Sequence, residues 1–226
     1  MGFLRRYRFE LYLSSFVALV FGSLIFPSPF FERYMDPLLT LANVIAGFGI
    51  ISERRRYFKI YSVLVAGVVI LEVMRFAFGA GDNIDLKLIR FAVLSLFYTI
   101  VTLEIIRQVW FATEVNKNVI FGVMGGYVSM GLIAFFIVLG IEISEPGSFL
   151  GLDNSTGTSQ SENLFYFAYI TLMTVGYGDI TPVTILAQKA SILIALLGQF
   201  YLVIITAVVV GKYINNELRR DTFERD

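Results

Sequence analysis

The residues of this chain that could bind an ion stand in one short stretch, TLMTVGYGDITP, where two glycines alternate with larger residues. Glycine adopts positive φ without the penalty that a Cβ brings, so Gly176 and Gly178 let the backbone alternate between left- and right-handed conformations. Such a backbone turns successive carbonyl oxygens to one side. Carbonyl oxygens suit a weakly hydrated monovalent cation, which must bind and also leave. The predicted ion-binding row comprises Thr174, Val175, Gly176, Tyr177, Gly178 and Asp179.

A half-helix must position this row. The preceding segment, Glu162–Met173, is apolar and aromatic but far shorter than the roughly 20 residues that a bilayer-spanning helix needs. It fits a helix that enters the membrane and stops half-way, with Ser159 and Glu162 as a capping box at its start. Non-helical backbone at membrane depth must be buried in protein or line water, so the row should line a water-filled path between several copies. The residues expected in this pore helix include Phe165, Tyr166, Phe167 and Thr171.

Composition places the chain in a membrane. Hydrophobic residues make up 57% of it, charged residues 16%, and the mean hydropathy is +0.74. The sequence has no Cys and no His, so it offers no disulfide, no thiol chemistry and no Cys or His metal site. The zero net charge gives no sign of a nucleic-acid partner. The sequence shows no nucleophile–base pair and no phosphate-binding loop, so we expect neither an enzyme nor a cofactor.

Six apolar stretches could cross a bilayer as helices, some of them marginally. Helices are preferred over strands because the apolar runs are continuous and do not alternate. The stretches are Leu11–Phe26, Pro37–Ile51, Phe58–Ala80, Leu86–Ile106, Val119–Ile141 and Val183–Tyr213. The expected fold class is therefore an all-α membrane protein with six transmembrane helices, a re-entrant pore helix and an extended ion-binding segment.

Basic residues set the expected orientation. Thirteen Lys and Arg residues lie in segments on the same side of the membrane as the N-terminus, whereas the loops on the opposite side hold only Arg33. Both termini are therefore predicted to be cytoplasmic, in a multi-pass protein of the cell membrane. Arg5, Arg6 and Arg8 before an apolar run would also fit a signal peptide, but no small-residue cleavage site follows them.

The opposite side is acidic, and its loop before the pore helix holds no Lys or Arg. A ring of carboxylates from several copies would raise the local concentration of cations. The acids expected in this ring are Glu142, Glu145, Asp153, Glu162 and Asp179.

The stretch TLMTVGYGD resembles the selectivity-filter signature of potassium channels. The resemblance is strongest over Phe165–Asp179 and continues to about Lys212, and the six-span plan resembles the voltage-gated branch of the tetrameric cation channels. It implies a bundle of voltage-sensor type over residues 1–113 and a pore domain with a short cytoplasmic tail over residues 114–226. It also implies that K⁺ binds the carbonyls of Thr174, Val175, Gly176 and Tyr177.

The same resemblance gives further residues a role. Pro182 would start the inner helix, and Gly198 would be its hinge, although a glycine there could instead allow close packing. Thr206 and Val210 would form the cavity wall and the inner constriction. The sequence departs from the family where Tyr166-Phe167 replaces a frequent Trp-Trp pair, and where Ile170 replaces a glutamate found in some prokaryotic relatives.

Charges inside the spans argue against a steep voltage response. The fourth span carries only Lys87 and Arg90 at its outer end, which we interpret as interfacial anchors, whereas steep gating takes about 3–4 charges per subunit. Glu72 and Arg75 lie three apart in the third span and are expected to form a structural ion pair rather than a transport relay. Glu104 should pair with Arg107 in the same way.

The sequence thus predicts a homotetrameric, potassium-selective channel with weak or no voltage dependence, whose partners are three further copies and membrane lipids. Two alternatives stay open. One is a weakly selective cation channel, and the other is a silent subunit or membrane scaffold that keeps the fold without conducting.

Overall fold

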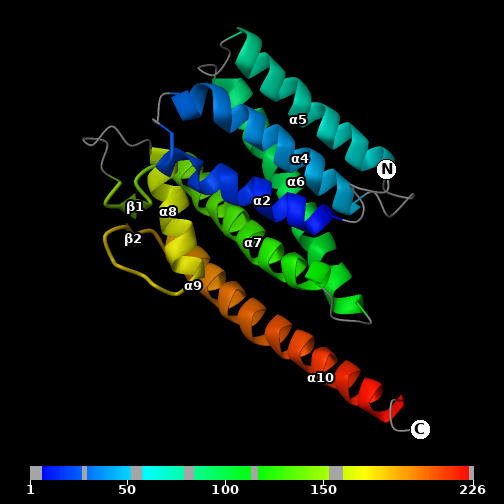
Figure 1. Ribbon diagram of the computed structural model, residues 1–226. Helices are drawn as coiled ribbons and strands as arrows, with labels where there is room; N and C mark the ends of the chain where they lie inside the picture. Colours follow the sequence, from blue (N-terminus) through cyan, green and yellow to red (C-terminus); the bar gives the residue numbers. More distant parts are fainter. Residues whose placement is uncertain are drawn as a thin grey trace. The chain divides into compact units, whose positions relative to one another are not determined.

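The computed structural model describes residues 7–26, 30–51, 58–78, 84–112, 117–152 and 160–223 (Figure 1). The long helices are α2 (Arg8–Phe21), α4 (Asp36–Ile51), α5 (Phe58–Phe78), α6 (Ile84–Phe111), α7 (Lys117–Ser144), α8 (Gln160–Leu172), α9 (Ile185–Phe200) and α10 (Thr206–Phe223). Shorter turns are η1 (Gly22–Leu24), η2 (Phe31–Met35) and η4 (Tyr201–Ile205). Strands β1 (Phe149–Leu150) and β2 (Thr181–Pro182) pair antiparallel, with Phe149 opposite Pro182. The all-α membrane fold class is confirmed.

Three helices of the described part are long and apolar enough to cross a membrane: Ile89–Phe111, Lys117–Ser144 and Ile185–Ile214. The last of these runs through α9, η4 and α10, which follow one another without a break. Asp36–Ile51 and Tyr61–Met74 are apolar but shorter. Because α2 has only 14 residues, the full set of six spans stays a prediction.

The chain folds into two compact units, residues 1–126 and 127–226. The sequence placed this boundary before α7, whereas in the structure it falls within that helix. The first turns of α7 join the first unit because a glycine lets them pack closely. A Cβ at Gly122 would lie 3.2 Å from the Val109 side chain of α6.

In the first unit, α4 packs against α2, α5 and α6, and α5 also packs against α6 (Figure 1). Its apolar core encloses a polar centre at Asn43, which is fully buried on α4. The Asn43 amide donates to the Tyr12 carbonyl and to the Ser15 hydroxyl, each at 3.0 Å. The Tyr98 hydroxyl donates to the Asn43 side-chain oxygen at 2.9 Å. These bonds join α2, α4 and α6 through one side chain whose polar atoms are satisfied.

In the second unit, the core forms where the second half of α7 and the helices α8 and α9 supply apolar side chains. Its buried members are Ala134, Val138, Ile141, Phe149, Leu164, Phe167, Ala168, Leu172, Ile180, Ala187, Ala190 and Ile194. Gly131 on α7 makes room for the ring of Tyr169, whose hydroxyl donates to the Val128 carbonyl at 2.7 Å. This contact fixes α8 against α7.

Candidate functional site

Helix α8 begins slightly before the predicted half-helix, at Gln160, and ends one residue before its predicted end, at Leu172. Ser159, half of the expected capping box, lies outside the described residues. Phe167 is buried and packs edge-on against Phe149, with ring centroids 5.1 Å apart. Phe165 packs edge-on against Phe135 of α7, with ring centroids 5.5 Å apart. Aromatic packing on both sides therefore holds α8 within its unit.

The backbone after α8 alternates in handedness. Its φ is positive at Thr174 (57°), Gly176 (54°) and Gly178 (80°). The residues between them, Val175 and Tyr177, are not among the positive-φ residues of the described part. The predicted positive φ of both glycines is confirmed. The sequence did not predict a left-handed Thr174, which is costly for a β-branched residue and marks a strained position.

The N–H groups at the start of this stretch turn back to α8. The Thr174 N–H donates to the Thr171 carbonyl at 3.0 Å, and the Val175 N–H donates to the Ile170 carbonyl at 2.9 Å. The Gly176 N–H reaches the same Ile170 oxygen at 3.4 Å. In a trans peptide the carbonyl points opposite to the N–H that follows it. The carbonyls of Thr174 and Val175 therefore both point away from α8, as an ion-binding row requires.

The side chains of this row are exposed in the single chain. Tyr177 is 73% exposed and Val175 is 47% exposed, whereas the next apolar residue, Ile180, is only 6% exposed. A Cβ built at Gly176 or Gly178 would meet nothing within 4 Å. The side chains in the middle of the row thus face open space in the single chain.

The segment after the row is held by the loop that follows α7. Besides the β1–β2 pairing, the Val183 N–H donates to the Ser148 carbonyl at 2.9 Å. Gly151 has φ of 87°, and its backbone lies so close to the Asp179 carbonyl that a Cβ there would overlap with the oxygen. Sequence reasoning missed this contact, because no local pattern links Gly151 to a residue so far along the chain.

Glu142 corrects the predicted acidic ring. It is only 6% exposed, and one of its oxygens accepts from the Gly147 N–H at 2.8 Å and from the Gln160 side-chain amide at 3.0 Å. It therefore ties the end of α7 to the start of α8 instead of facing ions. Its second oxygen is buried and has no hydrogen-bond partner within the described residues. Of the other predicted ring members, Glu145, Glu162 and Asp179 are exposed, and Asp153 lies outside the described residues.

Asp179 has a partner that the sequence did not reveal. The Tyr166 side chain makes a hydrogen bond with the Asp179 side chain. The sequence indicated only that Ile170, which replaces the glutamate of some relatives, cannot pair with Asp179. The Tyr166 contact means that Asp179, at the end of the row, is linked to α8 by a tyrosine.

Helix α9 begins after the predicted position. Pro182, expected to start the inner helix, lies in β2 instead, and the helix starts at Ile185. Thr184 is its N-cap, and the Thr184 side-chain oxygen accepts from the Ala187 N–H at 3.3 Å. The cap satisfies a backbone donor that a proline could not.

Gly198 is buried against α8. A Cβ there would overlap with the Leu172 carbonyl oxygen and lie 3.0 Å from the carbonyl carbon. This is the close packing that the sequence left open as the alternative to a hinge, and the hinge itself stays a prediction. The π-helical turn η4 follows within one turn. Thr206 and Val210 are exposed in the single chain, and their roles in the cavity wall and the constriction stay predictions.

Arg90 is more than an interfacial anchor. Its Nε donates to a carboxylate oxygen of Glu72 at 2.6 Å, and the Glu72 residue is only 1% exposed. A second guanidinium nitrogen lies 3.9 Å from Asp36. The side chains of Arg75 and Lys87 lie outside the described residues, so the predicted Glu72–Arg75 pair stays a prediction.

Comparisons with known proteins find similarity to ion channels. Residues 126–215 match the family model described as ion channel. Over 86 residues, 37% of the chain, it is 28% identical to "Potassium voltage-gated channel subfamily A member 5" of Oryctolagus cuniculus and 33% identical to that of Mustela putorius furo. Over the same length it is 31% identical to subfamily A member 4 of Homo sapiens.

The matched segment covers 14% of the two member 5 relatives and 13% of the member 4 relative. The chain therefore spans much less than two thirds of the length of these relatives. No solved structure matches the chain. Residues 126–215 of this all-α membrane protein are thus similar to the ion channel family and to potassium channels.

Proposed function

We propose that the chain is the subunit of a homotetrameric channel through which K⁺ passes selectively and passively. The observation that carries this proposal is the alternating backbone of Thr174–Gly178, whose first N–H groups bind α8 and whose first carbonyls point away from it. K⁺ would be held by the carbonyls of Thr174, Val175, Gly176 and Tyr177. The names of the relatives, which are potassium channels, support the choice of ion.

Assembly into a tetramer is supported by what one subunit leaves exposed. Tyr177 is 73% exposed, although its large ring would be expected to pack in a finished site. A single chain also supplies only one wall of an ion path. Light scattering of the purified protein should give a protein mass of four times 25.5 kDa.

Potassium flux into proteoliposomes, together with potassium–sodium reversal potentials, tests the proposal directly. Gly178→Ala places a Cβ at a φ of 80°, and Tyr177→Val removes the exposed ring, so both should degrade the preference for potassium. Gly211→Ala and Tyr213→Val on α10 are matched controls that should leave selectivity intact.

The outcomes separate the alternatives. A wild-type protein that reconstitutes but carries no flux would be a silent subunit or scaffold. Equal potassium and sodium permeability in the wild type would indicate a weakly selective cation channel. Unchanged reversal potentials in both variants of the row would refute the assignment of the filter.

We further propose that voltage dependence is weak or absent. Moving one charge across the field yields about 2.3 kcal/mol per 100 mV, and steep gating takes about 3–4 charges per subunit. The fourth span carries only Lys87 and Arg90 near one end, and Arg90 is bound to the buried Glu72. The proposed protein lies in the cell membrane with both termini in the cytoplasm, and it needs no cofactor and no nucleic acid.

A further inference from the structure

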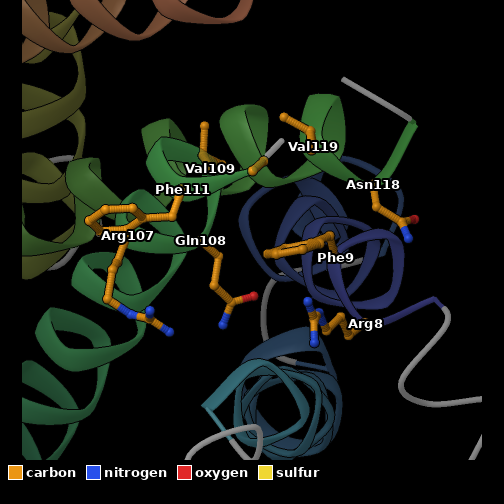
Figure 2. A pocket seen from close by; sticks show the side chains of 9 residues that line it. Arg8, Phe9, Arg107, Gln108, Val109, Phe111, Asn118 and Val119 are labelled. Atoms are coloured by element: carbon orange, nitrogen blue, oxygen red, sulfur yellow. The ribbon is translucent and has the colours of Figure 1, made fainter. Parts of the chain in front are cut away.

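A cavity of about 330 Å³ opens in the first unit, at the start of α2, the end of α6 and the start of α7 (Figure 2). Its lining includes Arg8, Phe9, Arg107, Gln108, Phe111 and Asn118. We propose that this cavity binds the head group of an anionic phospholipid that carries a hydroxyl beside its phosphate. The proposal does not depend on whether the chain conducts potassium.

Two arginines supply the attraction for a phosphate. The Arg107 guanidinium is held by Glu104 on the same helix, as the sequence predicted, with Nε donating to one carboxylate oxygen at 2.9 Å. The carbon at the centre of the Arg8 guanidinium lies 4.9 Å from the centroid of the Phe9 ring. Both cations are thus oriented before a ligand arrives, which lowers the entropy cost of binding. Arginine also matches the geometry of phosphate oxygens with pairs of N–H donors.

Gln108 indicates a second feature of the ligand. Its amide nitrogen donates to the Ile50 carbonyl at 2.9 Å and to Glu104 at 2.8 Å, so the orientation of the amide is fixed. Its oxygen is buried and has no hydrogen-bond partner among the described residues. Figure 2 shows this oxygen on the side of the cavity that faces Phe9 and Arg8. An ionised phosphate has no proton to donate to it, whereas a hydroxyl of the head group does.

The position of the cavity favours a lipid as the source of this chemistry. Candidate membrane spans end at Phe111 and begin at Lys117, so the cavity lies where two spans meet the membrane surface. Phe111 is 71% exposed and Trp110 is 47% exposed beside the cavity. These apolar side chains offer a surface along which acyl chains could leave the site.

The single tryptophan of the chain, Trp110, gives a direct readout. Bromine atoms on lipid acyl chains quench tryptophan fluorescence at close range. The protein is reconstituted in vesicles that mix phosphatidylglycerol and phosphatidylcholine, with bromine on one lipid at a time. At equal mole fractions, brominated phosphatidylglycerol should quench Trp110 more strongly, with an apparent preference of about 3- to 10-fold.

Variants assign this preference to the cavity. Arg8→Gln removes a cation, and Asn118→Asp places a negative charge of the same shape in the lining, so each should bring the preference close to 1-fold. Lys59→Gln is the control, because it removes a basic residue from the start of α5 that does not line the cavity. A preference that survives both cavity variants, or that falls equally in the control, would overturn the proposal.

The head group itself is tested with phosphatidylmethanol, which has the same charge but no hydroxyl. Its preference should be about 2- to 5-fold weaker than that of phosphatidylglycerol, because the Gln108 oxygen stays unpaired. An equal preference for phosphatidylmethanol and phosphatidylglycerol would show that the hydroxyl does not contribute to binding, and it would refute the proposal as stated. Soluble glycerophosphoglycerol distinguishes the source: failure to displace the lipid supports a lipid site, and displacement at micromolar concentration would overturn the lipid assignment.

Discussion

Replacing Gly198 by alanine should disturb the ion-binding row through the end of α8. The Gly198 backbone lies against the Leu172 carbonyl, and Leu172 ends the helix that carries the row. An alanine Cβ would overlap with the oxygen and lie 3.0 Å from the carbonyl carbon. The atoms that must yield belong to the backbone, so no flexible side chain can absorb the change. Relief requires a separation of α8 and α9 on the order of 1 Å.

The cost follows from this overlap. Overpacking in a close-packed core costs about 1–3 kcal/mol, and a clash with backbone belongs at the upper end of that range. For a chain of this length, a loss of about 2–3 kcal/mol lowers the melting temperature by roughly 4–12 °C. The separation also moves Leu172 and the carbonyls that follow it, so we expect a weaker preference for potassium over sodium.

Thermal unfolding in detergent and reversal potentials in bilayers measure the two effects. Gly211→Ala on α10 is the matched control, since a Cβ there meets nothing within 4 Å and alanine favours a helix. A hinge makes a different prediction, in which Gly198→Ala alters open probability and leaves stability and selectivity unchanged. That result would refute the packing argument.

Three further predictions concern buried polar and charged side chains. Asn43→Leu should lower the free energy of unfolding by about 2–4 kcal/mol, seen as a lower melting temperature, because it removes the three hydrogen bonds through which Asn43 joins α4 to α2 and α6. Glu142→Gln should leave conductance at low ionic strength unchanged, because Glu142 is buried, whereas Glu145→Gln should lower it if exposed acids concentrate cations. Conductance should vary little with voltage over roughly ±150 mV. Arg90→Gln should lower the free energy of unfolding, because it removes the guanidinium that pairs with the buried Glu72 carboxylate, and it should leave the dependence of conductance on voltage unchanged.

Features set by local chemistry could be predicted from the sequence. The positive φ of Gly176 and Gly178 follows from the absence of a Cβ, and the pairing of Glu104 with Arg107 follows from their spacing on one helix. Each needs only residues that are close in sequence. The same locality explains why the short helix α8 could be predicted before any tertiary contact was known.

Features that depend on the register between elements could not be predicted. Arg90 meets Glu72 because α5 and α6 run side by side, a contact across 18 positions of sequence. Glu142 is indistinguishable in the sequence from its exposed neighbour Glu145, and only the fold of the loop after α7 buries it. The charge of a residue is local information, whereas its burial and its partner are tertiary.

A close glycine contact lies at each end of the ion-binding row. Gly198 lies against the Leu172 carbonyl before the row, and Gly151 lies against the Asp179 carbonyl at its end. Both ends are thus fixed by contacts within one subunit. Between them, a Cβ at Gly176 or Gly178 would meet nothing within 4 Å. In the proposed tetramer, the ends of the filter would therefore depend on the fold of each subunit, and the spacing of its central carbonyls would depend on contacts with the neighbouring copies.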